Sequence, residues 1–133
     1  MRVRDVMTTK ALFAIGENDS LASAAHRMAW IGCRHLPVTR GQEVVGVLSE
    51  RDLLVWKAEG HTLDGPKDRV GSAMSAPPVV ATPDEELTEA AARMISLHIG
   101  CLPVVIHGQL VGMLTSTDIL GSLVSRSFDQ DKP

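Results

Sequence analysis

Aromatic side chains and clustered positive charge are both scarce in this chain of 133 residues. It has two tryptophans, two phenylalanines and no tyrosine, and its 13 lysines and arginines are scattered along a chain with a formal net charge of −3. Nucleic-acid binding needs a concentrated basic surface, and stacking of bases needs aromatic platforms. The composition therefore argues against a nucleic-acid partner.

Long apolar runs are missing as well. No segment approaches the roughly 18 consecutive apolar residues that a transmembrane helix needs. Charged residues also interrupt the N-terminal sequence MRVRDVMTTK, where a secretory signal would carry an apolar core. We therefore expect no membrane span and a cytoplasmic location.

Motifs for metal binding and catalysis are also absent. The two cysteines, Cys33 and Cys101, lie far apart without a CxxC spacing, which favours reduced, half-buried thiols over a disulfide or a metal site. The sequence contains no P-loop, GxGxxG, HExxH or nucleophile elbow. We expect no catalytic residue, no metal ligand and no required cofactor, so an enzyme is the least favoured class.

The most informative positive feature is an internal repeat. The stretch GVLSERDLL at residues 46–54 returns as GMLTSTDIL at residues 112–120, so that Asp118 follows Asp52 by 66 positions. The same offset places Leu36-Pro37-Val38 on Leu102-Pro103-Val104. We expect a first repeat at residues 1–56, a linker rich in Gly, Pro and charge at 57–69, a second repeat at 70–125 and a C-terminal tail at 126–133.

Each repeat predicts the same order of elements. A short helical turn (3–7 and 70–74) leads to a strand (11–15 and 78–82), then to an amphipathic helix whose apolar stripe runs from Leu21 to Ile31 in one repeat and from Leu87 to Leu97 in the other, and then to a hairpin and a final helix (50–60 and 116–125). A capping box at 82–85 should start the second amphipathic helix, and Gly32 and Gly100 lie near the ends of the two helices. A β-α-β-β-α unit of about 60 residues is marginal by itself, so the two copies should share a core.

In motif order and duplication, the chain resembles a tandem pair of cystathionine-β-synthase (CBS) domains, also called a Bateman module. The resemblance implies a mixed α/β (α+β) fold in which two β-α-β-β-α repeats pack as one pseudo-twofold module. It also implies an adenosine-containing ligand (AMP, ADP, ATP or S-adenosylmethionine) in the cleft between the repeats. A homodimer whose four units form a flat disc is expected, with a separate regulated protein as partner.

The repeated hydroxyl and carboxylate have two readings. Ser49 with Asp52, and Thr115 with Asp118, have the spacing of a helix N-cap, and a helix N-terminus also attracts phosphate. A short carboxylate held there can accept two hydrogen bonds from a ribose diol. The resemblance implies that Asp52 and Asp118 bind ribose and that the two hydroxyls lie near the phosphates.

The same resemblance implies further site residues, and each of them also has an alternative in which it plays only a structural or solvent-exposed part. Arg34 and His35 precede the first Leu-Pro motif and are candidates for contacting phosphate, the histidine in a manner sensitive to pH near 6.5, or they are polar residues that face water. The first signature carries Arg51 where the second carries Thr117. Six residues are expected to line the adenine slots, although each also suits a core strand: Lys10, Leu12, Pro37, Pro78, Val80 and Pro103.

Two functions remain open. The first is a regulatory module that senses an adenosyl ligand through differential affinity for two arrangements of its parts. The alternative is an assembly element that dimerises without any ligand. The succession Leu53-Leu54-Val55-Trp56 favours contact with the other repeat or a second chain, because it presents apolar residues to more than one helix face.

Overall fold

A computed structural model describes the backbone of residues 1–10 and 12–131 and the side chains as far as residue 125. The chain divides into two compact units. The repeat-1 unit comprises Phe13–Val79, and the repeat-2 unit comprises Met1–Leu12 together with Val80–Pro133. Of the expected tail at 126–133, residues 126–131 continue the last helix, which ends at Asp131, and residues 132–133 lie outside the described residues.

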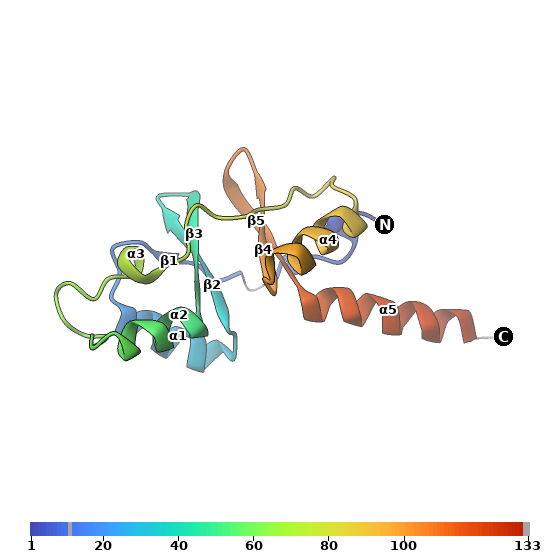
Figure 1. The fold of residues 1–133 in the computed structure, drawn as a ribbon. Coiled ribbons are helices and arrows are strands. Elements are labelled where there is room, and N and C mark those ends of the chain that lie inside the picture. Colours follow the sequence, from blue (N-terminus) through green and yellow to red (C-terminus); the bar gives the residue numbers. More distant parts are fainter. Residues whose placement is uncertain (11, 132–133) are drawn as a thin grey trace. The chain divides into compact units, whose positions relative to one another are not determined.

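The repeat-1 unit contains strands β1 (Ile15–Gly16), β2 (His35–Arg40) and β3 (Glu43–Ser49). Strand β1 pairs with β2 in parallel, and β2 pairs with β3 as an antiparallel hairpin. Helices α1 (Leu21–Ile31) and α2 (Glu50–Ala58) pack against each other, and α3 (Val70–Ala73) contacts β1 and β3 (Figure 1). The predicted β-α-β-β-α order is confirmed in this unit.

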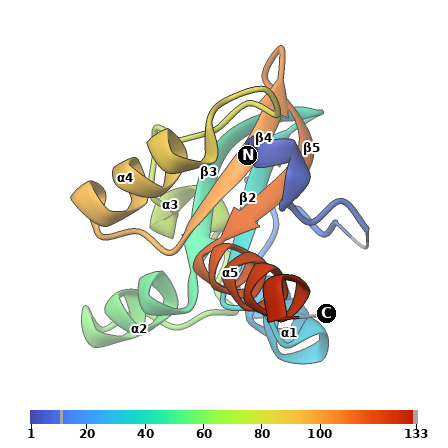
Figure 2. The same ribbon diagram turned by 90° about the vertical axis from the view of Figure 1, so that its right-hand side faces the viewer.

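The repeat-2 unit begins with a short 3₁₀ helix, η1 (Val3–Asp5), and continues with α4 (Leu87–Leu97). Strands β4 (Cys101–Ile106) and β5 (Gln109–Thr115) form an antiparallel hairpin, and α5 (Ser116–Asp131) follows directly from β5 (Figure 2). His107 and Gly108 at the hairpin tip both have positive φ, 51° and 80°, which suits a two-residue turn. The mixed α/β class is therefore confirmed.

The predicted apolar stripes form the cores. In α1, Leu21, Ala24 and Met28 are buried against strand residues that include Leu36 and Leu48. The equivalent residues of the second repeat do the same: Leu87, Ala90, Met94, Leu102 and Leu114. Each fully buried Leu or Met contributes about 1.5–3 kcal/mol relative to its exposed state.

The two short helical turns pack with the opposite repeat. Val3 N–H donates to Glu85 O at 2.9 Å, and the equivalent Val70 N–H donates to Asp19 O at 2.9 Å. Residues 3–8 therefore belong to the unit of the second repeat, and residues 70–75 to that of the first. The compact units are offset from the sequence repeats, because the chain crosses between units at 12–13 and at 79–80.

Three local predictions are wrong. Of the described residues in the strand expected at 11–15, only Ile15 is in a strand, at the start of β1. The strand expected at 78–82 is replaced by a single β-bridge between Ala81 and Val104. Both segments lie where the chain crosses from one unit to the other, so they cannot continue the hydrogen-bond ladder of the unit that they leave. In the second segment the adjacent Pro77 and Pro78 also lack the backbone N–H that a strand needs. The second amphipathic helix starts one turn late, with Glu86 as its N-cap.

The third error concerns the end of that helix. Gly32 ends α1 in the left-handed conformation as expected, but His98 (φ 55°), and not Gly100, takes that role in α4. A histidine tolerates this conformation better than a β-branched residue does.

The segment between α2 and α3, expected to be a linker, is held in place by a buried carboxylate. Asp68 is 7% exposed and accepts hydrogen bonds from Thr62 Oγ1 at 2.6 Å, Gly65 N–H at 2.8 Å and Trp56 Nε1 at 3.0 Å. The Trp56 ring stacks on His61 with a centroid separation of 4.1 Å. The hydrogen bond from Thr62, supported by those from Trp56 and Gly65, lowers the pKa of Asp68.

Candidate functional site

The repeated Ser/Thr-x-x-Asp signature forms a helix cap in each unit. Asp52 N–H donates to Ser49 Oγ at 3.0 Å while Ser49 N–H donates to Asp52 Oδ2 at 2.8 Å. At the start of α5, Asp118 N–H donates to Thr115 Oγ1 at 3.1 Å, and Thr115 N–H donates to Asp118 Oδ2 at 2.9 Å. The N-cap reading of these residues is thus correct as far as it goes.

A third residue reaches each carboxylate from the segment that arrives from the other repeat. Thr8 Oγ1 donates to Asp118 Oδ1 at 3.1 Å, and Ser75 Oγ donates to Asp52 Oδ1 at 3.3 Å. Sequence reasoning missed both hydroxyls. The signal was present, because a hydroxyl residue follows the methionine in Val6-Met7-Thr8 and in Ala73-Met74-Ser75.

The glycine of each signature explains how these segments come so close. A Cβ at Gly46 would lie 2.6 Å from Met74 Sδ and 2.9 Å from Ser75 O. A Cβ at Gly112 would lie 2.9 Å from Met7 Sδ and 3.1 Å from Thr8 O. The glycine, the hydroxyl and the aspartate of the signature therefore serve one local arrangement.

Both carboxylates keep capacity for a ligand. An ionised carboxylate offers about four acceptor positions, and the cap N–H and the third hydroxyl use two of them. Asp52 and Asp118 are half-buried, so water or a small molecule reaches them. One free acceptor position on each oxygen matches the two donors of a vicinal diol.

The basic candidates lie close to the Asp52 cap. His35 and Ser49 are direct partners in the β2–β3 hairpin, and Arg34 O accepts the N–H of Glu50 at 2.9 Å. Burial lowers the pKa of His35, although the charge of Asp52 opposes the shift. The lowered pKa favours the neutral imidazole of His35 more than the ordinary value of about 6.5, expected from the sequence, would. Arg34 and Arg51 are exposed.

The residues expected to line adenine slots divide between the units. Pro37 and Pro103 are buried in β2 and β4. Pro78 belongs to the unit of Asp52 and is half-buried. The unit of Asp118 contains Lys10, Leu12, Val80, Pro103 and Thr117. Chain crossing thus places Lys10 and Leu12 with the second signature, although the sequence assigned them to the first repeat.

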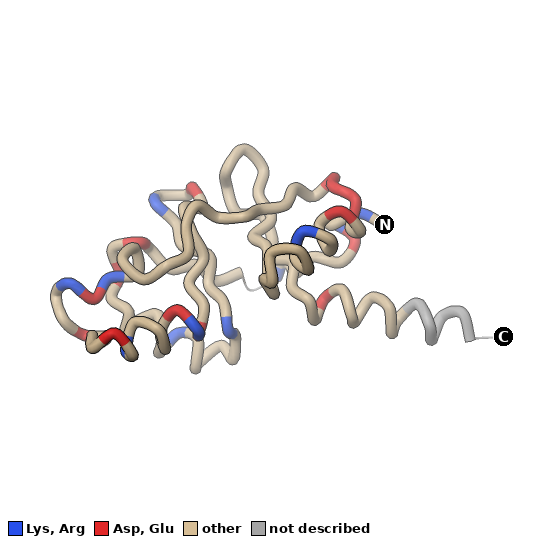
Figure 3. Tube along the Cα trace, viewed as in Figure 1, with Lys and Arg blue, Asp and Glu red and all other residues tan. Residues whose placement is uncertain are grey.

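The charge pattern of the repeat-2 unit places its ion pairs at the start of α4. Arg4 pairs with Asp84 and Arg2 with Glu86, which ties the N-terminal segment to the second repeat. Figure 3 shows acidic and basic positions close to the N-terminus. By contrast, Asp118 is the single charged residue between 116 and 125 of α5. The exposed face of that part of α5 is therefore uncharged, with Leu120 62% and Leu123 57% exposed.

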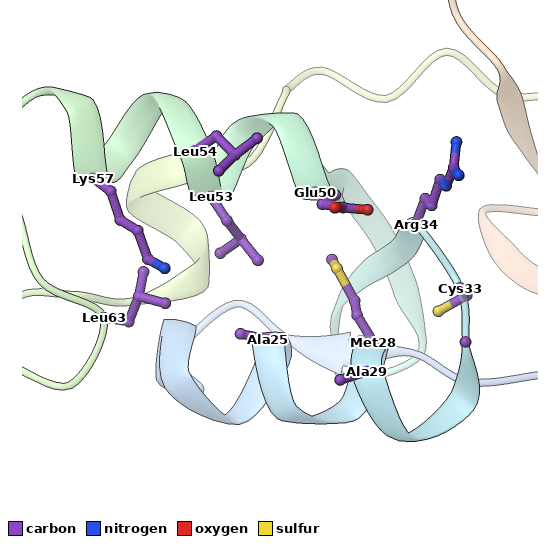
Figure 4. Close-up of a pocket in the computed structure, with 11 residues that line it drawn as sticks. Ala25, Met28, Ala29, Cys33, Arg34, Glu50, Leu53, Leu54, Lys57 and Leu63 are labelled. Carbon is purple, nitrogen blue, oxygen red and sulfur yellow. The ribbon is translucent and has the colours of Figure 1, made fainter.

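A separate groove of about 410 Å³ lies between α1 and α2. Met28 and Leu53 face each other across it, and Cys33 and Arg34 stand at one end (Figure 4). Arg34 and Glu50, which lie beside the Asp52 cap, are among its lining residues, but Asp52 is not. Among the described side chains, no three His, Cys, Asp or Glu residues are grouped as metal ligands. No helix in the described part of the chain has the length and apolar character needed to cross a membrane.

The family model of the CBS domain matches the chain twice, over residues 3–59 and 70–125. A homoserine O-acetyltransferase from Methanosphaerula palustris is 36% identical over 125 residues, which cover 93% of this chain and 24% of that protein. The chain therefore spans about a quarter of the length of that curated relative.

Solved structures share the fold. The crystal structure of CBSX2 in complex with AMP superposes with a TM-score of 0.83 at 26% identity, covering 95% of this chain and 98% of that one. The crystal structure of the CBS domain pair of protein MJ0100 in complex with 5′-methylthioadenosine and S-adenosyl-L-methionine gives a TM-score of 0.83 at 24% identity, with the same two coverages. At that identity the second likeness shows the fold alone.

Proposed function

Because the chain belongs to the CBS domain family, we propose that it is a regulatory binding module for an adenosine-containing ligand, with one candidate site in each compact unit. The candidates are AMP, ADP, ATP and S-adenosylmethionine, which share adenine and ribose. The 26% identical CBSX2 structure is a complex with AMP, which supports this ligand class. The module itself needs no cofactor and carries out no reaction.

One observation carries the proposal. Asp52 and Asp118 have the same arrangement in two units: a helix start, a cap N–H on Oδ2 and a hydroxyl on Oδ1. A cap alone does not require the third hydroxyl, the half-exposed carboxylate or the duplication. We assign ribose to the carboxylates and phosphate, where the ligand has one, to the positive end of the helix dipole.

Arg34 and Arg51 supply positive charge beside the Asp52 cap, with His35 next to Arg34, and they favour an anionic ligand in the repeat-1 unit. All three lie within two residues of the cap or of its partner strand, where the sequence of the second unit has Gly100, Cys101 and Thr117. Arginine can bind phosphate with two parallel hydrogen bonds. We therefore expect the Asp52 site to prefer nucleotides that carry phosphate, and the Asp118 site to accept a less anionic adenosyl compound.

Calorimetric titration of nucleotide-free protein tests the proposal. The panel is AMP, ADP, ATP and S-adenosylmethionine, and the variants are Asp52→Asn, Asp118→Asn and the double variant. Asparagine keeps the shape and one acceptor for the cap, but it loses the charge. Hydrogen bonds to a charged group contribute about 1.5–3 kcal/mol, so each variant should weaken its site about tenfold to hundredfold.

Glu50→Gln is the matched control. It removes one negative charge from the same first turn of α2 but leaves the Ser49–Asp52 cap intact. Its affinity for the panel should stay within a factor of about two of wild type. Equal losses in Glu50→Gln and Asp52→Asn would show a general effect of charge and would contradict the assignment of ribose to Asp52.

Exposed apolar helix faces support a second proposal, that the chain forms a homodimer. Trp30 of α1 is 85% exposed, Leu54 of α2 61% and Ile95 of α4 75%, and the described part of α5 adds Leu120 and Leu123. Exposed apolar surfaces of this kind mark protein contacts. If the chain is an assembly element without a ligand, these faces form its contacts and Asp52 and Asp118 bind no ligand.

Sedimentation equilibrium separates the two functions. Trp30→Asp combined with Leu54→Asp should convert a dimer to a monomer, whereas Asp52→Asn with Asp118→Asn should leave the dimer unchanged. A dimer that persists in the first variant would contradict this surface as the interface. A wild-type dimer that binds none of the four adenosyl compounds would favour the assembly function.

We also propose that occupancy is passed to another protein or domain. The relative from Methanosphaerula palustris is about four times as long as the matched region, so in that protein the matched region accompanies a larger remainder. Ligand binding stabilises whichever arrangement binds it more tightly, by an amount set by the differential affinity.

A further inference from the structure

Thr8 and Ser75 contact the two aspartates in the same way, although their surroundings differ. Thr8 follows a 3₁₀ helix and Ser75 follows an α-helix, and the neighbouring sequences are VMTT and AMSA. In both units the shortest contact of the hydroxyl is to Oδ1, the oxygen that the cap N–H leaves open, and Ser75 Oγ also lies 3.5 Å from Asp52 Oδ2. From this repetition we propose that Thr8 and Ser75 are positioning residues, which orient the carboxylates of Asp118 and Asp52 toward the ligand. The inference rests on the proposed function and deepens it.

The hydroxyls are not needed to hold their segments in place. Thr8 N–H donates to Met113 O at 2.8 Å, and Met113 N–H donates to Thr8 O at 2.9 Å. Ser75 and Val47 exchange the same pair of bonds, at 2.9 and 3.1 Å. Each segment is thus fixed by two backbone bonds, so the exposed hydroxyl is free to serve the carboxylate alone.

A carboxylate that accepts a hydrogen bond at each oxygen is restrained from rotating about its terminal torsion. With the cap N–H on Oδ2 and the hydroxyl on Oδ1, the one free acceptor position on each oxygen keeps a fixed direction. A vicinal diol then meets two oriented acceptors and does not have to order them. Preorganisation of this kind raises affinity because less freedom is lost on binding.

The positions of the two residues in the chain give the contact a regulatory role. Thr8 lies four residues before the crossing at 12–13, and Ser75 lies four residues before the crossing at 79–80. A ligand on Asp118 therefore acts on the segment that leads to the repeat-1 unit, and a ligand on Asp52 acts on the segment that leads to the repeat-2 unit. The hydroxyl is the connection between site and crossing.

Variants that remove only the hydroxyl provide the test. Thr8→Val has nearly the shape of threonine, and Thr8→Ser restores the hydroxyl without the methyl group. Both are made in an Asp52→Asn background, so that the Asp118 site is read alone. Thr9→Val, at an exposed neighbouring position, is the matched control. The probes are AMP, S-adenosylmethionine and 2′,3′-dideoxy-AMP, which lacks the diol.

We expect Thr8→Val to weaken AMP or S-adenosylmethionine about threefold to tenfold, less than the loss of a direct hydrogen bond to a charged group, because the hydroxyl acts on the ligand only by orienting the carboxylate. Thr8→Ser should recover wild-type affinity, Thr9→Val should not change it, and the weak binding of 2′,3′-dideoxy-AMP should be the same in every variant. Hydrogen exchange provides the second measurement. AMP should slow exchange at residues 6–10 in the parent protein and not in Thr8→Val.

The outcomes separate the inference from the proposed function. If the parent binds AMP and Thr8→Val binds it equally well, the positioning role is overturned and the adenosyl site stands. The same conclusion follows if Thr8→Val loses as much affinity for 2′,3′-dideoxy-AMP as it loses for AMP. Unchanged exchange at residues 6–10 overturns the regulatory role of the contact. If the wild-type chain binds neither AMP nor S-adenosylmethionine, the proposed function and this inference fall together.

Discussion

Replacing Gly46 by alanine tests the packing of the crossing segment on its hairpin. The new Cβ would lie 2.9 Å from Ser75 O, a backbone atom that both hydrogen bonds to Val47 hold in place. Met74 Sδ, at 2.6 Å, can rotate away, but the carbonyl oxygen cannot move without shifting residues 74–76. Overpacking of this kind costs about 1–3 kcal/mol.

A smaller term opposes this loss. Alanine has fewer accessible conformations than glycine in the unfolded chain, which stabilises the folded state by about 0.4–1 kcal/mol. With mid-range values of about 2 kcal/mol for the cost and about 0.7 kcal/mol for the gain, the net loss for Gly46→Ala is about 1.3 kcal/mol, or a fall of roughly 5 °C in Tm for a chain of this size. Gly112→Ala should lose less, because its Cβ would lie 3.1 Å from Thr8 O.

Urea denaturation followed by circular dichroism measures the free energy of unfolding. Gly121→Ala is the control, because Gly121 lies in α5 with no neighbouring heavy atom within 4 Å of the added Cβ. It should gain up to about 1 kcal/mol from helix propensity. A Gly46→Ala variant as stable as wild type would refute the packing of residues 70–75 on β3, and a larger loss in Gly112→Ala would refute the ranking.

Two further predictions concern buried groups. The lowered pKa of Asp68 stabilises the folded state fully above the ordinary pKa of 3.8, and this stabilisation is lost as the pH falls through the lowered pKa. Asp68→Asn should therefore lower Tm at pH 7, and the variant should lose less stability than the parent when the solution is acidified. Trp56 fluorescence in a Trp30→Phe background reports this transition, and an acid response identical to that of the parent would contradict it. Burial raises the pKa of Cys101 to about 12. A disulfide reagent at pH 8 should therefore modify Cys33 first and Cys101 only when the protein unfolds. Equal rates of modification of the two cysteines in the native protein would contradict this burial.

Much of the fold follows from local patterns. The spacing of Leu21, Ala24 and Met28 sets one helix face, and Leu36-Pro37-Val38 is apolar enough to fix a core strand. These signals need only neighbours in sequence, and they recur in the second repeat. The Ser/Thr-x-x-Asp signature likewise predicted both caps, because a cap is made within four residues.

The exchange of segments could not be predicted in the same way. Residues 3–8 begin the first repeat in sequence, but Thr8 pairs with Met113 of the second repeat, a contact between residues more than 100 positions apart. Alignment at an offset of 66 carries no information about which copy receives which segment. Thr8 and Ser75 were missed for this reason, since their role depends on the carboxylate that the exchange brings near.

The most direct test of the account is a crystal structure of the chain with AMP. We predict ribose hydroxyl oxygens within hydrogen-bond distance, about 3 Å, of the carboxylate oxygens of Asp52, of Asp118 or of both. AMP bound in the groove between α1 and α2, with both carboxylates making no contact to it, would contradict the assignment of the site.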